Sequence, residues 1–123
     1  MRFTLLVLSA PDFGCANRHA LRFARAVIDG GHELACVFFQ DRGVLTALKD
    51  CESAQAEEDL RSAWQGIARD GDADLAVCSA SAARFGVADG RRADNILDGF
   101  ALSGLGDLVM ARGDSDRFLT FAD

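Results

Sequence analysis

Several residue patterns are missing from this sequence, and each absence argues against a class of function. No apolar run approaches the roughly 18 residues that a membrane-spanning helix needs, so no membrane contact is expected. The chain has no C-x-x-C pair, and His19 and His32 are its only histidines, so no structural metal site is expected. Lys49 is the single lysine, and the net charge is −6. Nucleic-acid surfaces need clustered cations, so no direct nucleic-acid contact is expected.

What the sequence does contain is enough apolar material for a core. Of its 123 residues, 50% are hydrophobic and nine are phenylalanine, which predicts a single domain over residues 1–123. The opening "MRFTLLVLSAPDF" alternates like a first strand and shows no clear cleavage site, so we expect a cytoplasmic protein. Four cysteines at scattered spacings are then expected to be reduced thiols.

Strand patterns alternate with helix patterns along the chain. This order predicts an α/β fold, with three α/β/α layers and a largely parallel sheet of about five strands. Residues 43–51 fit either a short helix or a loop. The expected strands cover residues 3–9, 32–41, 74–78 and 117–121. The expected helices cover residues 17–29, 54–70, 79–85 and 103–112.

Particular residues fix the predicted faces and ends of these helices. In the second helix Leu60, Trp64 and Ile67 share one stripe, which predicts that they are buried and that Arg61 points outward. Ser103 is expected to cap the last helix. The glycines of "SGLG" lack the third glycine and the early position of a dinucleotide fingerprint, so they are interpreted as packing points.

Cys78 ends an apolar strand and precedes a stretch of small residues. In open α/β sheets, ligands and chemistry collect at the carboxyl ends of strands. The N–H groups of a helix that starts at Ser79 or Ala80 would favour the thiolate, and Arg84 would add positive charge nearby. The alternative is a small buried residue that completes the strand, because free cysteine is among the most buried residue types. The residues alone leave both interpretations open.

The other three cysteines have weaker claims to chemistry. Cys36 lies in the middle of a strand and is predicted to be structural. Cys51 lies in the ambiguous segment and is interpreted as a surface thiol without a role. Cys15 lies in the loop after the first strand, at the same sheet edge as Cys78 if the strands are parallel. It is either a second sulfur-handling thiol or an incidental loop residue.

A charged loop follows Cys78 in the sequence. Asp89 and Asp94 flank Arg91 and Arg92, and a solvated loop is the simpler interpretation than acid–base chemistry. No Ser-His-Asp arrangement is evident along the chain.

These motifs together resemble those of the DsrE/TusD family of sulfurtransferase subunits. The most specific parts are C-x-x-x-A-x-R-x-G-V at residues 78–87 and F-x-L-S-G-L-G-x-L at residues 100–108. Further matching stretches run nearly from end to end: "MRF", "FARAVIDGGHEL", "VFFQDRGV", "DNILDGFALSGLG" and "DRFLTF".

The resemblance implies a DsrE-like fold and a sulfurtransferase without a cofactor, in which Cys78 carries a persulfide. Family members of this kind sit in a heterohexamer with two shorter paralogues. They take sulfur from one persulfide carrier protein and pass it to another. In one branch the sulfur ends in 2-thiouridine at the tRNA wobble position, which is the expected destination here. In the other branch, the DsrEFH-type complexes, it serves cytoplasmic sulfur oxidation.

Two further interpretations stay open beside the sulfur relay. The chain is a non-catalytic scaffold subunit if loss of Cys78 leaves sulfur transfer intact. It is a free-standing thiol protein if Cys15 and Cys78 form a disulfide on mild oxidation.

Overall fold

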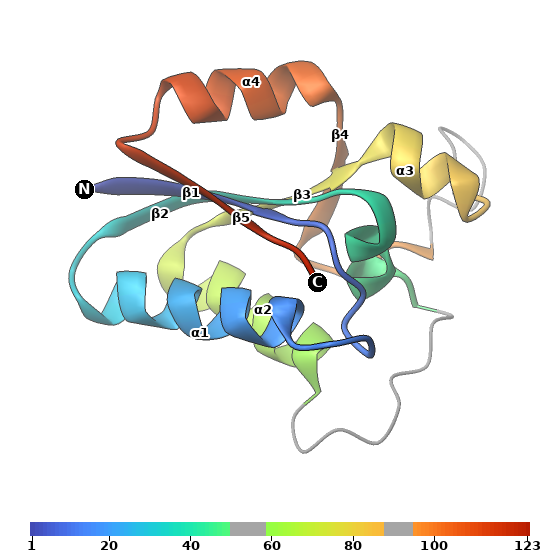
Figure 1. Cartoon of the computed structure of the whole chain (residues 1–123), viewed down its shortest axis with the longest axis horizontal. Coiled ribbons are helices and arrows are strands. Elements are labelled where there is room, and N and C mark those ends of the chain that lie inside the picture. The colour runs from blue at the N-terminus through green and yellow to red at the C-terminus, as the bar shows by residue number, and fades with distance from the viewer. Residues whose placement is uncertain (50–58, 88–94) are drawn as a thin grey trace.

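The computed structural model describes residues 1–49, 59–87 and 95–123, and its centre is a parallel sheet. The described strands follow the order β4-β3-β2-β1-β5, and every neighbouring pair is parallel (Figure 1). The prediction of a largely parallel sheet of about five strands is confirmed. The strands are β1 (Arg2–Val7), β2 (Glu33–Phe39), β3 (Asp74–Cys78), β4 (Phe100–Ser103) and β5 (Arg117–Phe121).

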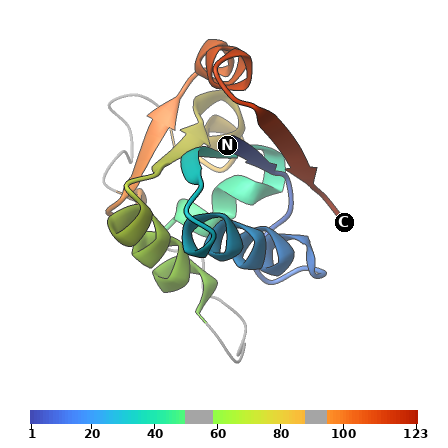
Figure 2. The same cartoon turned by 90° about the vertical axis from the view of Figure 1, so that its left-hand side faces the viewer.

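Helices cover both faces of the sheet, so the predicted three layers are confirmed. Figure 2 shows α1 and α2 together beneath the sheet and α4 above it, with β4 and β5 at opposite edges. The helical segments are α1 (Ala16–Asp29), the 3-10 helix η1 (Asp41–Ala47), α2 (Leu60–Gly71), α3 (Ser79–Arg84) and α4 (Leu105–Gly113). Among the described residues, no helix has the length and apolar character needed to span a membrane.

The main core lies between the sheet and the α1–α2 layer. Phe39 of β2 packs edge-on against Trp64 of α2, with ring centroids 5.3 Å apart, and both side chains are fully buried. Leu60 and Ile67 are buried beside them, as their helical spacing predicts. Arg61 was expected to point outward, and this is wrong. Its side chain is buried, because its Nη2 donates a hydrogen bond to the carbonyl of Leu45 in η1 at 3.3 Å.

The opposite face of the sheet is covered thinly. None of the residues of α4 is buried, and this helix packs chiefly against β2. Its apolar side chains Leu105, Val109 and Met110 are exposed. Because α4 covers this face only in part, a cavity lies between α4 and strands β3 and β4.

One strand differs from the sequence expectation. Residues 100–103 were not expected to form a strand, and Ser103 was expected to cap the last helix. Instead Ser103 ends β4, and the N-cap of α4 is Gly104. Four residues give too short a pattern to show strand periodicity, and pairing with β3 is what holds them extended.

The start of α1 is capped from a distant part of the chain. Its N-cap residue, Cys15, forms no side-chain cap. The carboxylate of Asp123 instead accepts hydrogen bonds from the backbone N–H groups of Cys15 and Ala16, at 3.0 and 3.2 Å. Gly14 has a φ of +64°, and a Cβ atom there would collide with the Asp123 carboxylate, so glycine is required.

Candidate functional site

The parallel strands place several loops at one edge of the sheet. β1, β2 and β3 all end there, since parallel strands share a carboxyl edge. Cys15 follows β1, Asp41 follows β2, and Cys78 ends β3. The expectation that Cys15, in the loop after β1, lies at the same sheet edge as Cys78 is therefore confirmed.

Cys78 lies at the junction between β3 and α3. It is the last residue of the strand and the N-cap of the helix, which begins at Ser79, one of the two starts that the sequence allows. Its thiol caps no backbone N–H, and the residue is only 2% exposed. Of the small residues that follow, Ala82 is buried, whereas Ala80 and Ala83 are exposed. The buried and the exposed sides of α3 therefore both carry small side chains close to Cys78 in the sequence.

The strand alternation determines which face of the sheet Cys78 occupies. Val77 pairs with Phe39, whose ring contacts α2, so Val77 lies on the α2 face. Successive side chains point to opposite faces, which places Cys78 on the α4 face. Its register partner across β4 is Ser103. The hydroxyl of Ser103 donates a hydrogen bond of 2.6 Å to Oδ2 of Asp107 in α4.

A second polar contact ties α3 to the end of β2. Asp41 adopts a φ of +53°, a left-handed conformation that is uncommon for any residue except glycine. Its backbone N–H donates to the buried hydroxyl of Ser81 at 2.9 Å. Its carboxylate lies 3.7 Å from the guanidinium of Arg84, with both side chains largely exposed. The positive charge of Arg84, expected near Cys78, is therefore paired.

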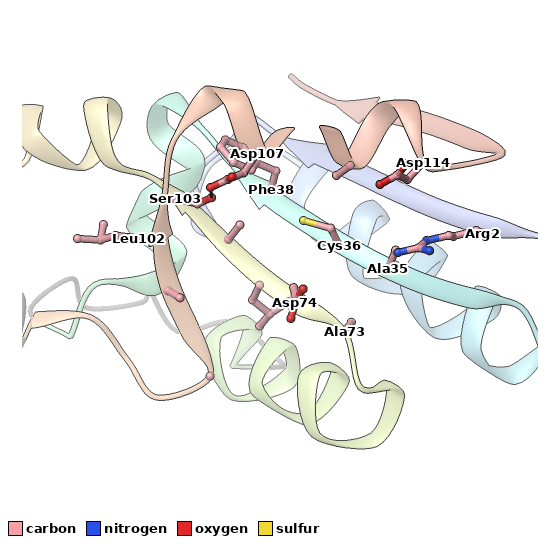
Figure 3. A pocket seen from close by; sticks show the side chains of 15 residues that line it. Arg2, Ala35, Cys36, Phe38, Ala73, Asp74, Leu102, Ser103, Asp107 and Asp114 are labelled. Carbon is pink, nitrogen blue, oxygen red and sulfur yellow. Dashed lines mark hydrogen bonds between the residues drawn. The ribbon is translucent and has the colours of Figure 1, made fainter. Parts of the chain in front are cut away.

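A cavity of about 490 Å³ opens between α4 and the sheet (Figure 3). Its floor includes Cys36 and Phe38 of β2, Ala76 of β3 and Ser103 of β4. Three carboxylates and one guanidinium also line it, those of Asp74, Asp107, Asp114 and Arg2. The cavity therefore combines an apolar floor with a mostly acidic lining.

Cys36 has the environment of an unreactive thiol. Burial, followed by the negative charges of Asp74 and Asp107, raises the pKa of Cys36 to about 11. At neutral pH its sulfur is almost entirely protonated, and the thiol form is a poor nucleophile. The location and the electrostatics agree with the predicted structural role.

The remaining candidate residues are dispersed or lie outside the described ranges. Cys15 is exposed, and it, Cys36 and Cys78 are all free thiols. Cys51, Asp89, Arg91, Arg92 and Asp94 fall outside the part of the chain that the structure describes. Within the described part, no group of three or more His, Cys, Asp or Glu side chains is arranged to hold a metal ion.

Sequence reasoning missed the polar neighbours of Cys78. The bond from Ser103 to Asp107 depends on β4, which the sequence did not reveal, although the four-residue spacing of these residues is visible. The contact between Asp41 and Ser81 joins residues 40 positions apart, and no local pattern signals it.

Comparison with known proteins places this chain in a family. Residues 1–121 match the DsrE/DsrF-like family. The sulfurtransferase TusD of Klebsiella pneumoniae (strain 342) is 43% identical over 129 residues, covering 98% of this chain and 100% of that protein. The sulfurtransferase TusD homolog of Vibrio parahaemolyticus is 36% identical, covering 98% of both chains. The E. coli ychN protein shares the fold, with a TM-score of 0.79, 18% identity and coverage of 98% and 100%.

The fold and site define an α/β protein with a cysteine at the carboxyl end of β3, an inner strand of the sheet. The chain belongs to the DsrE/DsrF-like family. It is a sulfurtransferase with a role in sulfur relay, as the near full-length similarity to several TusD sulfurtransferases indicates.

Proposed function

We propose that Cys78 accepts a sulfane sulfur as a persulfide and passes it to the next carrier. The observation that carries this proposal is the position of Cys78 at the end of β3 and the N-cap of α3, in a chain similar from end to end to TusD sulfurtransferases. Cys36 is the other described cysteine on this face, and its raised pKa makes it a poor nucleophile.

The proposed chemistry needs no cofactor. The thiolate of Cys78 attacks the outer sulfur of a donor persulfide, R–S–SH. A new S–S bond forms at Cys78, the donor S–S bond breaks, and the donor leaves as the thiolate R–S⁻ with the electron pair. The reverse sequence on an acceptor thiol releases the sulfur, so no net oxidant or reductant is consumed.

The proposed partners are proteins. Persulfide carrier proteins act as donor and acceptor, and two shorter paralogous subunits complete a heterohexamer. The exposed apolar side chains Leu105, Val109 and Met110 on α4 support a protein contact on that side. Phe13, which is 66% exposed beside a hollow that Arg42 also lines, supports another at the carboxyl edge.

The proposed destination of the sulfur is 2-thiouridine at the tRNA wobble position, reached through the carrier proteins in the cytoplasm. The negative net charge supports a role upstream of the RNA, because direct contact would need clustered cations. A bacterial strain that lacks its own TusD tests this destination. The chain should restore wobble 2-thiouridine, measured by nucleoside mass spectrometry, and Cys78→Ser should not. Absence of restoration by the unaltered chain would count against this destination.

Intact-mass measurement tests the role of Cys78 directly. The reduced protein is incubated with a persulfidated carrier protein, and a gain of one sulfur atom is mapped by peptide. We expect the gain at Cys78, its loss in Cys78→Ser, and its retention in the matched control Cys36→Ser. A gain spread over Cys15 and Cys51 instead would contradict the proposal.

The same measurement decides the scaffold alternative. The nearly complete burial of Cys78 is the observation that favours it, since a relay sulfur must meet a partner's thiol. If Cys78 gains no sulfur while Cys78→Ser still assembles with the paralogues and supports transfer, the chain is a scaffold.

A further inference from the structure

We propose that Asp107 determines which sulfur donors reach Cys78: its carboxylate repels small anionic donors such as hydrogen disulfide, so that Cys78 takes its sulfur from a protein-bound persulfide. This inference rests on the proposed function of Cys78. It assigns a role to the "SGLGDL" motif, which the relay chemistry alone leaves without one.

The register of the sheet brings Asp107 close to Cys78. Cys78 and Ser103 are directly paired across β3 and β4, and neighbouring strands lie about 4.8 Å apart. Paired residues of parallel strands share a face, so Ser103 and Cys78 both lie on the α4 side. The hydroxyl of Ser103 then holds the Asp107 carboxylate on this side of the sheet through a hydrogen bond of 2.6 Å. The negative charge thus lies within about one Debye length, roughly 8 Å, of the sulfur.

The cavity is the open space adjoining this side of β3. Ala76 precedes Cys78 by two residues and lies on the same face, and both Ala76 and Ser103 line the cavity. Figure 3 shows Ser103 and Asp107 at one end of the cavity and Arg2 toward the other. Cys78 itself does not line the cavity, so a small donor held beside Ser103 lies one strand away from Cys78 and next to the Asp107 carboxylate.

The charges around the cavity leave it negative. Arg2 is the only cation that lines it among the described residues, and its guanidinium lies 3.8 Å from the Glu33 carboxylate. Asp74, Asp107 and Asp114 remain, and no ion pair joins Asp107 to a cation within the described ranges. The charges of Asp74 and Asp107 both act on Cys36, so their field reaches the cavity floor.

The negative charge of Asp107 affects the reaction with a small donor because both reactants are anions. A Cys78 thiolate and a hydrogen disulfide anion, HS–S⁻, give a Cys78 persulfide anion and hydrosulfide. The S–S bond of the donor breaks, and HS⁻ leaves with the electron pair. Two anions must meet in this step, and a third nearby negative charge opposes the encounter. A carrier protein can offset this repulsion with cations of its own, whereas a free anion cannot.

Paired alkylating reagents measure the potential at Cys78 without a sulfur donor. Iodoacetamide is neutral, whereas iodoacetate is anionic and is slowed by negative charge near the sulfur. Both reagents react with the thiolate, so the fraction of thiolate cancels in the ratio of the iodoacetamide rate to the iodoacetate rate at Cys78. We expect Asp107→Asn to lower this ratio about two- to fivefold at low salt, which is the effect expected from removing one nearby charge in a solvent-filled site. Asp74→Asn is the matched control. It lies four residues back along β3, at about 13 Å, and should change the ratio less than 1.5-fold.

Salt supplies a test that needs no substitution. In the unaltered chain, the ratio should fall toward that of Asp107→Asn when the salt concentration reaches about 1 M, where the Debye length is about 3 Å. The inference is overturned if the ratio changes neither with salt nor with Asp107→Asn. It is also overturned if Asp74→Asn lowers the ratio as much as Asp107→Asn does, or if neither reagent labels Cys78. If Asp107→Asn does not fold, the salt series decides alone.

Sulfur loading separates this inference from the proposed function. Hydrogen disulfide should load Cys78 two- to fivefold faster in Asp107→Asn, while loading from a persulfidated carrier protein stays unchanged. If the carrier never loads Cys78, the proposed function fails, whatever the alkylation ratio shows. If the carrier loads Cys78 but both donors respond alike to Asp107→Asn, the inference about donor selection fails and the relay role stands.

Discussion

Two cysteines on the same face of the sheet differ in what surrounds them. Cys36 lies mid-strand beneath α4, where burial and two carboxylates oppose its ionisation, and Cys78 lies at a strand end beside α3. We expect alkylation of Cys36 by iodoacetamide to stay slow at neutral pH and to rise about tenfold per pH unit until near pH 11, because only the thiolate reacts. Peptide-resolved mass spectrometry across pH 7–11 measures this. Rapid labelling of Cys36 at pH 7 would contradict the raised pKa.

Asn17 is a buried residue whose polar atoms are all used. Its amide donates to the Ser9 carbonyl at 3.1 Å and to Thr46 Oγ1 at 2.9 Å, and its carbonyl accepts from the Trp64 indole at 2.9 Å. Asn17→Ala removes the partner of polar groups in the loop after β1, in η1 and in α2, and we expect it to lower the free energy of unfolding by about 3 kcal/mol. Urea denaturation followed by Trp64 fluorescence measures this. The milder Thr46→Val removes one bond and should cost about 1 kcal/mol; equal costs for both would contradict the network.

At the scale of elements, the sequence predicts what repeats and misses what depends on distant partners. β3 and β5 have the bounds that their apolar runs predict, and the buried stripe of α2 follows from its spacing. β4 is too short to carry a period. The burial of Arg61 depends on η1, whose form the sequence left open. Cys78 could be selected from its position after a strand, whereas its neighbours Ser103 and Asp107 required the sheet register.

The cap of α1 gives a pH-dependent element. Hydrogen bonds from the N–H of Cys15, then of Ala16, together with the hydroxyl of Ser9 and the charge of His19, hold the pKa of Asp123 below its usual range. A depressed carboxyl pKa stabilises the fold above the pKa of the unfolded chain, and this contribution is lost as pH falls through the lower folded value. We expect Asp123→Asn to lower the melting temperature at pH 7.

An acid series checks the cap. The difference in melting temperature between the unaltered chain and Asp123→Asn should shrink as pH falls below about 4, where the unfolded carboxyl takes up its proton. The exposed Asp29 at the other end of α1 is the control. Asp29→Asn should not lower the melting temperature at pH 7, because a carboxylate at a helix C-terminus is unfavourable. A difference for Asp123→Asn that persists undiminished at low pH would contradict the cap.

For the molecule as a whole, helices cover the two faces of the sheet to different extents. A parallel sheet buries both faces, and here α1 and α2 cover one while α4, with no buried residue, covers part of the other (Figure 2). The side that carries the cavity also carries the exposed apolar residues of α4. The same face thus combines the proposed approach of sulfur donors with a surface suited to protein contact, and an assembly on this side would affect access to Cys78.

Val109 tests whether this face takes part in assembly. Its side chain is 69% exposed, so Val109→Glu should leave the melting temperature of the isolated chain nearly unchanged. In a contact with the paralogous subunits, the same change buries a charge without a partner, and we expect it to weaken association at least tenfold. Light scattering after co-expression with the paralogues measures the assembly. Ala26→Glu, at an exposed position of α1 on the opposite layer, is the matched control. Equal assembly of both variants would place the subunit contacts away from α4, and loss of assembly in both would point to the α1 layer as well.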